Sequence, residues 1–318
     1  MSSSSPRQQP GLTSQALRAL GRAIAGLTGM LQVRVVGMVG GPARARVIAL
    51  FGAVLALSSA DASTVGAVSP QLEHALHIGN AKIGLLSSVS ILVGAVFVLP
   101  VGLFVDRYKR VPLLAGCIVL WSVASLASAF APDYSTLLIT RLFLGAVTAA
   151  AGPAIASLTG DYFAASERGR VYAYILAGEA AGTAVGFVVS GTLASAFSWR
   201  VAFVVLGIPG FFLARALWRT VPEPLRGGQS RLHPGTENVE DAFSVAAAAR
   251  GPEPEDGEPG AGEEGELARA AASQRGIEPD PRLVLHEDPA RMGLIRATRY
   301  IMSIRTNFVL IVSQALGY

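Results

Sequence analysis

The sequence predicts an all-α, polytopic membrane protein. Its 318 residues have a mean hydropathy of +0.47, and only 15% of them are charged. Between residues 47 and 221 the apolar residues form six long runs, and the charged residues lie mostly in the short gaps between these runs. A helix needs about 20 apolar residues to cross about 30 Å of hydrocarbon at a rise of about 1.5 Å per residue. Each run is therefore long enough to span a bilayer.

The chain begins with residues 1–46, which we expect to form a cytoplasmic tail. Arginines continue up to the first apolar run, and no small-residue cleavage site follows a compact apolar core, so a cleaved signal peptide is not expected. Residues 47–221 then form the six-helix transmembrane bundle. Its predicted spans are Val47–Ser69, Ile83–Val105, Val111–Phe130, Leu137–Leu158, Val171–Phe197 and Val201–Val221. Because the gaps between the spans are short, neighbouring helices are expected to run antiparallel.

The amino-acid composition of the chain changes in residues 222–296. This segment is rich in Pro, Gly, Ala and acidic residues, with a dense acidic stretch from Glu253 to Glu266. Such a composition cannot bury enough apolar surface to offset the entropy lost on ordering. We therefore expect a disordered cytoplasmic linker. Hydrophobicity resumes in residues 297–318, which are predicted to be the incomplete start of a seventh transmembrane helix.

The distribution of basic residues predicts the orientation of the bundle. Basic residues near the ends of spans stay in the cytoplasm. Arginines and lysines collect in the tail before the first span and in the second and fourth gaps, whereas the other gaps carry only Lys82 and Arg200. The N-terminus is therefore predicted to lie in the cytoplasm, and the protein in the cell membrane.

Among the charged residues within the predicted spans, Asp61 and Arg141 lie at the same depth. Asp61 is eight residues before Ser69, at the outer end of the first span, and Arg141 is about six residues into the fourth span from the same side. The helical rise places both roughly 9 to 12 Å below the outer surface. A lone charge there costs at least about 2.5 kcal/mol, so each should face a partner or a water-filled cavity. An ion pair between them is the simplest solution.

This predicted pair has two possible roles. In a transport role, Asp61 alternates between a charged form that holds Arg141 and a protonated form that releases the arginine for an anionic group of a substrate, or that lets the helices move. In a structural role, the pair is static and fixes how the helices pack. Ionisable residues inside a membrane are a functional-site hypothesis by default.

The fifth predicted span carries an acid and a series of glycines. Glu179 lies about eight residues from the cytoplasmic end, where it could line an inward cavity and take part in proton coupling. Alternatively, its side chain could extend to the membrane surface or pair with a loop arginine. Gly178, Gly182 and Gly186 recur every four residues and form a flat ridge against which a neighbouring helix can pack closely. Gly145 in the fourth span is expected to act in the same way.

The gap after the second span contains a motif that resembles the loop signature of the major facilitator superfamily, G-x-x-x-D-R-x-G-R. The matching residues are Gly102, Asp106, Arg107 and Arg110, and Lys109 replaces the second glycine. By this resemblance, Gly102 would allow a close approach of helices and Asp106 would cap the start of a helix. The two arginines would hold the cytoplasmic end.

Further segments resemble the same family. The stretch Arg141–Gly145 is similar to the R-x-x-Q-G pattern of the fourth span, with leucine at the polar position. The segments Trp199–Phe203, Val221–Pro224 and Arg305–Asn307 resemble Spinster-type members. The glycine series of the fifth span resembles the motif of proton-coupled exporters, with Thr183 where that motif has proline. Together the resemblance covers about residues 47–224 and 297–318.

The resemblance implies the N-terminal half of a secondary transporter that moves a small organic or lipid-like solute by alternating access. The coupling ion is expected to be the proton, because the site offers carboxylates and an arginine. Likeness to Spinster proteins implies lipid-like amphiphilic substrates, and likeness to drug exporters implies efflux of apolar cations or antibiotics. The sequence leaves open whether the direction is export or uptake. The expected partners are membrane lipid, the solute, protons and a C-terminal six-helix half. The competing interpretation is a truncated, membrane-embedded interaction or scaffold protein without transport activity.

Other functional classes lack their signatures in this sequence. No glycine-rich phosphate loop with lysine, HExxH motif or metal-spaced group of Cys and His is present. We therefore expect no enzyme, no cofactor and no metal site. The lysines and arginines form no basic face with interleaved aromatic residues, so nucleic-acid binding is not expected.

Overall fold

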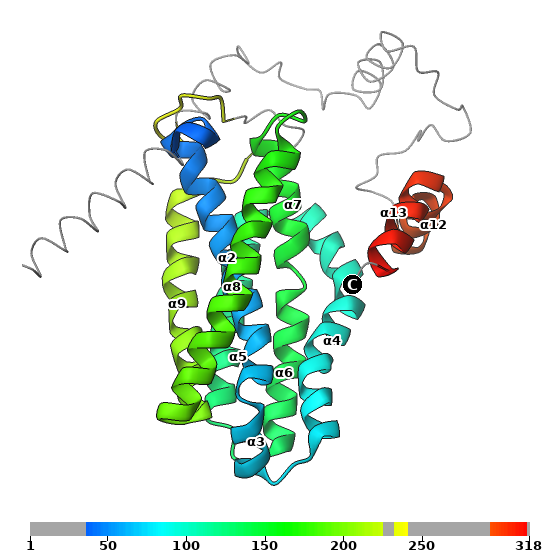
Figure 1. Cartoon of the computed structure of the whole chain (residues 1–318). Helices are drawn as coiled ribbons and strands as arrows, with labels where there is room; N and C mark the ends of the chain where they lie inside the picture. The colour runs from blue at the N-terminus through cyan, green and yellow to red at the C-terminus, as the bar shows by residue number, and fades with distance from the viewer. Residues whose placement is uncertain (1–35, 225–231, 241–292, 317–318) are drawn as a thin grey trace, which may run out of the picture.

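A computed structural model describes residues 36–224, 232–240 and 293–316. Within these residues, six helical segments are long and apolar enough to cross a membrane. These segments lie side by side in one elongated bundle (Figure 1). The protein is therefore a multi-pass membrane protein with the six-helix bundle that the sequence predicts.

The helices follow the predicted spans with small shifts at their ends. A short helix, α3 (Ser69–Leu76), occupies the first predicted loop. The fourth span consists of two helices, and every other span is a single helix. The helices that make the spans are α2 (Pro42–Ala67), α4 (Asn80–Arg107), α5 (Arg110–Ala129), α6 (Tyr134–Thr148), α7 (Ala151–Tyr162), α8 (Arg168–Ala196) and α9 (Trp199–Thr220).

Local chemistry explains where several of these helices begin. Helix α2 starts five residues before the predicted position because Gly40 and Gly41 adopt positive φ values of 86° and 129°, and Pro42 then occupies the first helical turn, where no N–H is needed. The break between α6 and α7 precedes Pro153, which has no N–H to donate to a carbonyl of the preceding turn. At the start of α6, the backbone N–H of Thr136 donates to the Asp133 carboxylate. This hydrogen bond caps the helix and lowers the pKa of the carboxyl.

The glycine ridge of α8 packs against α2. A Cβ atom at Gly182 would lie less than 3.0 Å from the carbonyl oxygen of Ala56, and one at Gly186 would lie equally close to Ala60. Gly178 is looser, because its Cβ would be 3.2 Å from a backbone oxygen of α2. The absence of side chains therefore allows the two backbones to touch, as the four-residue spacing predicts.

A second close approach joins α4 to α6. A Cβ atom at Gly145 would collide with the backbone of Ser90, and the hydroxyl of Ser90 donates to the carbonyl oxygen of Arg141 at 2.8 Å. Gly102 behaves differently, because a Cβ atom there would meet nothing within 4 Å among the described residues. The prediction that Gly102 permits close helix packing is therefore wrong for the described part of the chain.

The predicted linker is partly fixed to the bundle. Within residues 232–240, Leu232 and Val239 are buried, and the backbone N–H of Leu232 donates to the carbonyl oxygen of Tyr162 at 2.9 Å. For these residues the prediction of disorder is wrong, because two isolated apolar side chains find room in the core beside α7. Residues 225–231 and 241–292 of the predicted linker, and residues 1–35 of the predicted tail, lie outside the described residues.

The predicted start of a seventh helix is divided in two. Helix α12 (Leu294–Ser303) and helix α13 (Arg305–Leu316) meet at Ile304, whose backbone is extended. Helix α12 contacts α4 at the edge of the bundle (Figure 1). The sequence places one continuous helix here, whereas the structure has two helices separated by the extended backbone of Ile304.

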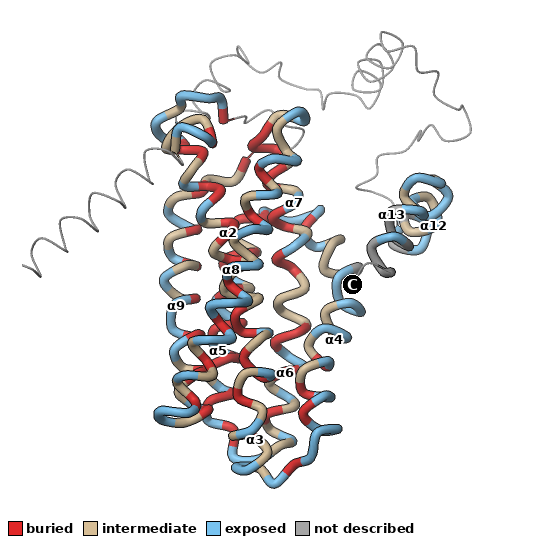
Figure 2. Tube along the Cα trace, viewed as in Figure 1, coloured by how far each residue is buried: buried red, intermediate tan, exposed pale blue. Residues whose placement is uncertain are grey.

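Burial is uneven around the bundle. Buried residues concentrate between α2, α5, α6 and α9, whereas α4 exposes most of its length (Figure 2). Only 11% of the apolar window of α4 is buried, and large side chains such as Ile91, Leu92 and Val96 are more than 60% exposed. An apolar surface of this kind suits contact with lipid tails or with further transmembrane helices.

Candidate functional site

The centre of the candidate site is an ion pair inside the bundle. Helix α2 supplies Asp61 and helix α6 supplies Arg141, and Nη1 of the arginine lies 2.8 Å from Oδ2 of the aspartate. Both residues are only 1% exposed. The structure thus brings together the two charges that their shared depth in the sequence predicts to meet.

Two serines of α5 complete the polar contacts of this pair. The hydroxyl of Ser125 donates to Oδ1 of Asp61 at 2.7 Å, and Nη2 of Arg141 donates to the hydroxyl of Ser128 at 2.6 Å. The guanidinium also lies over the ring of Phe203, 4.7 Å from its centroid. Sequence reasoning missed both serines. Their three-residue spacing, which places them on one face of a helix, is the signal that was available.

One nitrogen of Arg141 has no partner in the described part of the chain. Its Nε is buried and makes no hydrogen bond there. Asp61, in contrast, is held by both Arg141 and Ser125. The Nε–H of Arg141 can therefore donate a hydrogen bond to a polar group that enters beside it.

The ion pair forms part of the wall of a cavity. The cavity has a volume of about 480 Å³ and is lined by α2, α4, α6 and α7. Its wall is mostly apolar, with hydroxyl groups from Ser58, Ser87, Ser90 and Thr148. A few polar groups in an apolar cavity are typical of a site that binds a small organic molecule. The break between α6 and α7 also borders the cavity, through Ala149 and Gly152.

The arrangement places a carboxyl group beside an arginine in the wall of the cavity. Protonation of Asp61 would remove the negative charge that faces Arg141 and would weaken their ion pair. The arginine would then hold a buried positive charge with only Ser128 and the ring of Phe203 beside it. An anionic group in the cavity would replace the lost partner. The geometry therefore allows proton binding and anion binding at adjacent positions.

Glu179 lies apart from this pair. Its carboxylate accepts a hydrogen bond of 3.2 Å from Ser59 of α2, and it is partly buried. The loop-arginine partner that the sequence allowed is absent among the described residues. The structure therefore leaves Glu179 as a separate acid on α8, next to the glycine ridge.

A second charge cluster lies at the end of the bundle that carries most of the arginines. The buried guanidinium of Arg110 forms ion pairs with Asp161 of α7 and with Glu223, which follows α9. It also donates to Ser157 and to the carbonyl oxygen of Pro224. Asp161 and Glu223 were missed because the sequence places them in a loop and in a disordered linker.

The structure also locates the other residues of the loop motif. Asp106 and Arg107 are exposed in the last turn of α4. The N-cap of α5 is Lys109, and no side chain caps it. The prediction that Asp106 caps the start of a helix is therefore wrong, because α4 continues through this residue.

Replacing Glu223 with glutamine tests whether the segment after α9 is fixed to the bundle. The glutamine cannot form the ion pair with Arg110, whereas Asp161 remains. We expect the free energy of unfolding to fall by about 1 to 2 kcal/mol, measured by chemical denaturation in detergent. Replacement of the exposed Glu240 with glutamine removes the same charge and should have no measurable effect. Equal stability of the two variants would show that the Arg110–Glu223 contact does not contribute.

Comparison with known proteins identifies the family of this chain. Residues 50–312 match the Major Facilitator Superfamily. Protein spinster homolog 1 of Homo sapiens is 30% identical over 190 residues, which make up 59% of this chain and 36% of that protein. The 4-hydroxybenzoate transporter PcaK of Pseudomonas putida is 28% identical over 203 residues, or 64% of this chain and 45% of that protein.

A solved structure shares the fold. The crystal structure of a bacterial homolog to the human lysosomal transporter Spinster, inward-facing and unoccupied, superposes with a TM-score of 0.54 at 22% identity, covering 65% of this chain and 50% of that one. The present chain thus spans half or less of the length of these relatives. The family match nevertheless covers most of the chain, including residues 50–67 of the first membrane-spanning segment and all of the other five. The chain belongs to the Major Facilitator Superfamily.

Proposed function

We propose that this bundle is one half of a proton-coupled secondary transporter that moves a small organic or lipid-like solute by alternating access. The observation that carries the proposal is the Asp61–Arg141 ion pair in the wall of the 480 Å³ cavity. Two opposite charges inside an apolar bundle are costly to maintain for packing alone, because apolar residues of similar size often serve packing as well or better.

Asp61 is the proposed proton acceptor. In its charged form it holds Arg141, and in its protonated form it releases the guanidinium toward the cavity. Ser128 remains bonded to the arginine and would limit how far the side chain moves. The proton and the substrate would then stabilise the same conformational state, which is the requirement for coupling their movements.

The proposed substrate class is a small molecule with an anionic group and an apolar body. The free Nε donor of Arg141 suits the anionic group, and the apolar wall of the cavity suits the body. The relative PcaK is, by its name, a transporter of 4-hydroxybenzoate, a molecule with both features.

The remaining parts of the proposal concern the setting of the bundle. The basic residues at the end that carries Arg44, Arg110 and Arg168 favour a cytoplasmic location for that end and for the N-terminus. A cell-membrane location and a C-terminal six-helix half as partner complete the proposal. Because the proton and the solute are proposed to bind together, they would move in the same direction, and efflux would require the opposite order, in which solute binding displaces the proton from Asp61. Glu179, on α8, is proposed as a secondary group in proton coupling.

Transport assays in vesicles test this proposal. We compare the 318-residue chain with a form extended past Tyr318 to include a second six-helix half. The extended form should accumulate an aromatic acid such as 4-hydroxybenzoate, or another small organic anion, when a pH gradient is applied, and a proton uncoupler should stop it. The 318-residue chain should not transport, because the proposed second six-helix half is needed to close the cavity on its other side. Uptake by the 318-residue chain alone, or none by the extended form with any organic anion, would contradict the proposal and favour a scaffold function.

A further inference from the structure

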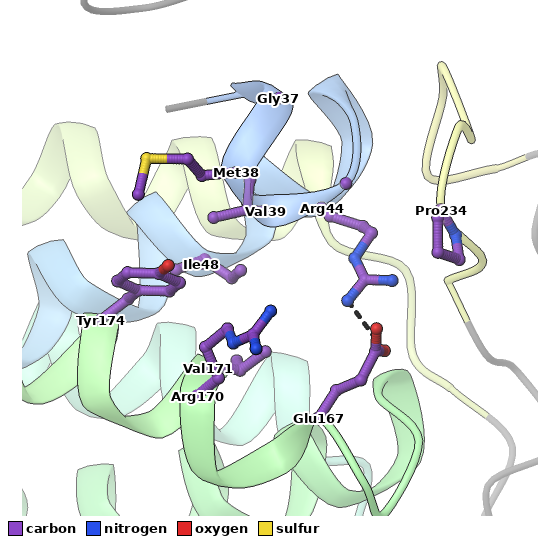
Figure 3. A pocket seen from close by; sticks show the side chains of 11 residues that line it. Gly37, Met38, Val39, Arg44, Ile48, Glu167, Arg170, Val171, Tyr174 and Pro234 are labelled. Atoms are coloured by element: carbon purple, nitrogen blue, oxygen red, sulfur yellow. Dashed lines mark hydrogen bonds and ion pairs between the residues drawn. The ribbon is translucent and has the colours of Figure 1, made fainter. Parts of the chain in front are cut away.

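A second, smaller cavity lies at the arginine-rich end of the bundle (Figure 3). It is formed between the first turns of α2, the residues just before α2, and the first turns of α8, and its volume is about 100 Å³. Three charged side chains face it: Arg44 of α2, Arg170 of α8, and Glu167, which precedes α8. The transport site described above uses none of them.

Arg44 is held rigidly on one side of this cavity. Its Nη2 lies 2.9 Å from the carboxylate of Glu167, and its Nη1 donates to the carbonyl oxygen of Leu232 at 3.3 Å. Its guanidinium also stacks over Phe163 at 5.3 Å from the ring centroid. Only 4% of the side chain is exposed, yet its Nε makes no hydrogen bond within the described part of the chain.

Arg170 is the second arginine of the site, and it is exposed to solvent. Figure 3 shows its guanidinium directed into the space below Val39, between Ile48 and Arg44. No ion pair or hydrogen bond of Arg170 is present among residues 36–224, 232–240 and 293–316. Glu167 is already paired with Arg44 and is 38% exposed. Two arginines and one carboxylate leave the cavity with a net charge of one positive unit, which a singly charged anion would balance.

The rest of the cavity is apolar and opens at the edge of the membrane-spanning helices. Val39, Ile48 and Val171 form its buried wall. Tyr174 lies across the cavity below Met38, which is 65% exposed (Figure 3). Tyrosines are enriched at the boundary between lipid and water. A ligand here would thus meet positive charge at one end and an exposed apolar rim at the other.

We propose that this cavity binds the phosphate group of an anionic phospholipid. Basic pockets between transmembrane helices recognise acidic lipid headgroups in this manner. A guanidinium offers paired N–H donors that match phosphate oxygens. The phosphodiester would contact Arg170 and lie beside Arg44, while the acyl chains would extend past Met38 along the outside of the bundle. A free phosphate shares the headgroup chemistry, but it would leave the apolar rim uncovered.

Native mass spectrometry of the purified 318-residue chain in detergent tests this proposal. The protein is titrated with phosphatidylglycerol, with phosphatidylcholine as the zwitterionic lipid and inorganic phosphate as the soluble anion. Arg170→Gln is compared with Arg46→Gln, which removes the same charge from an exposed position on α2 that does not line the cavity. Arg170 is exposed at the start of α8, so its replacement should leave the fold intact, which thermal unfolding checks.

The expected result is a preference for phosphatidylglycerol that Arg170→Gln removes. The dissociation constant should rise about tenfold in Arg170→Gln, as expected for the loss of one charge-assisted contact, and should stay within about twofold of the original in Arg46→Gln. Inorganic phosphate should not displace the lipid. Equal effects of the two substitutions, or equal binding of both lipids, would overturn the site. Displacement by inorganic phosphate would overturn the lipid as its ligand.

Discussion

Replacement of Asp61 with asparagine should abolish solute accumulation driven by a pH gradient in the form that contains both halves. Asparagine is similar in size and can still accept a hydrogen bond from Ser125, so the bundle should keep its structure. It cannot bind and release a proton, and it leaves Arg141 without its negative partner. We expect accumulation to fall to the level of empty vesicles. Exchange of labelled for unlabelled solute, which needs no net proton movement, should persist.

The matched control for this prediction is Asp133→Asn. Asp133 is an exposed carboxylate outside the cavity, and asparagine replaces aspartate well at the N-cap of a helix. This variant should accumulate solute at a normal rate. If Asp61→Asn also retained full gradient-driven accumulation, Asp61 would not carry the coupled proton, and its pair with Arg141 would have only a structural role.

Replacement of Gly182 with alanine should strongly destabilise the contact between α2 and α8. The new Cβ atom would collide with the carbonyl oxygen of Ala56, which is backbone and cannot rotate away. Overpacking of this kind typically costs about 1 to 3 kcal/mol. To relieve the collision, α2 and α8 must move apart. We therefore expect a loss at the upper end of this range. The free energy of unfolding in detergent measures it.

Gly191→Ala on the same helix provides the opposite expectation. Its Cβ would lie 3.8 Å from the nearest atom, the carbonyl oxygen of Ala67, which is an ordinary contact. Alanine favours the helix over glycine by up to about 1 kcal/mol, so this variant should be as stable as the original protein or more so. If both substitutions changed stability in the same direction and by the same amount, close backbone packing at Gly182 would not be needed.

Much of the fold could be predicted because lipid imposes simple rules on sequence. Each span needs a long apolar run, and each buried charge needs a partner. These rules were enough to predict six helices and to place Asp61 and Arg141 at one depth. The four-residue glycine spacing likewise predicts a flat ridge on α8, although it does not identify α2 as the neighbour.

The contacts that sequence reasoning missed depend on tertiary structure. Ser125 and Ser128 resemble ordinary small residues of an apolar span until the fold turns them toward the ion pair. Arg44 and Glu223 lie in segments whose composition predicts solvation, and only their packing against other helices makes them partners of Glu167 and Arg110. The pattern of residues within one segment does not show which residues of a distant segment it will contact.

The errors at the loop motif have a related cause. A family signature gives residue types and spacing but does not state where a helix ends in a particular chain. Helix α4 runs on to Arg107, so Asp106 is in its last turn and not at the start of the next helix. Gly102 meets no neighbour within the described residues, so the role that the signature suggested has no counterpart there.

The central claim is that Asp61 changes its protonation state when the transporter works. Infrared difference spectroscopy tests this most directly, by following the carboxylic acid C=O band as substrate is added to the form containing both halves, with Asp61→Asn as the reference. We predict that a band of a protonated carboxyl appears on substrate binding and that this band is missing in Asp61→Asn. An unchanged spectrum in this region, while the same sample transports solute down a pH gradient, would contradict the account.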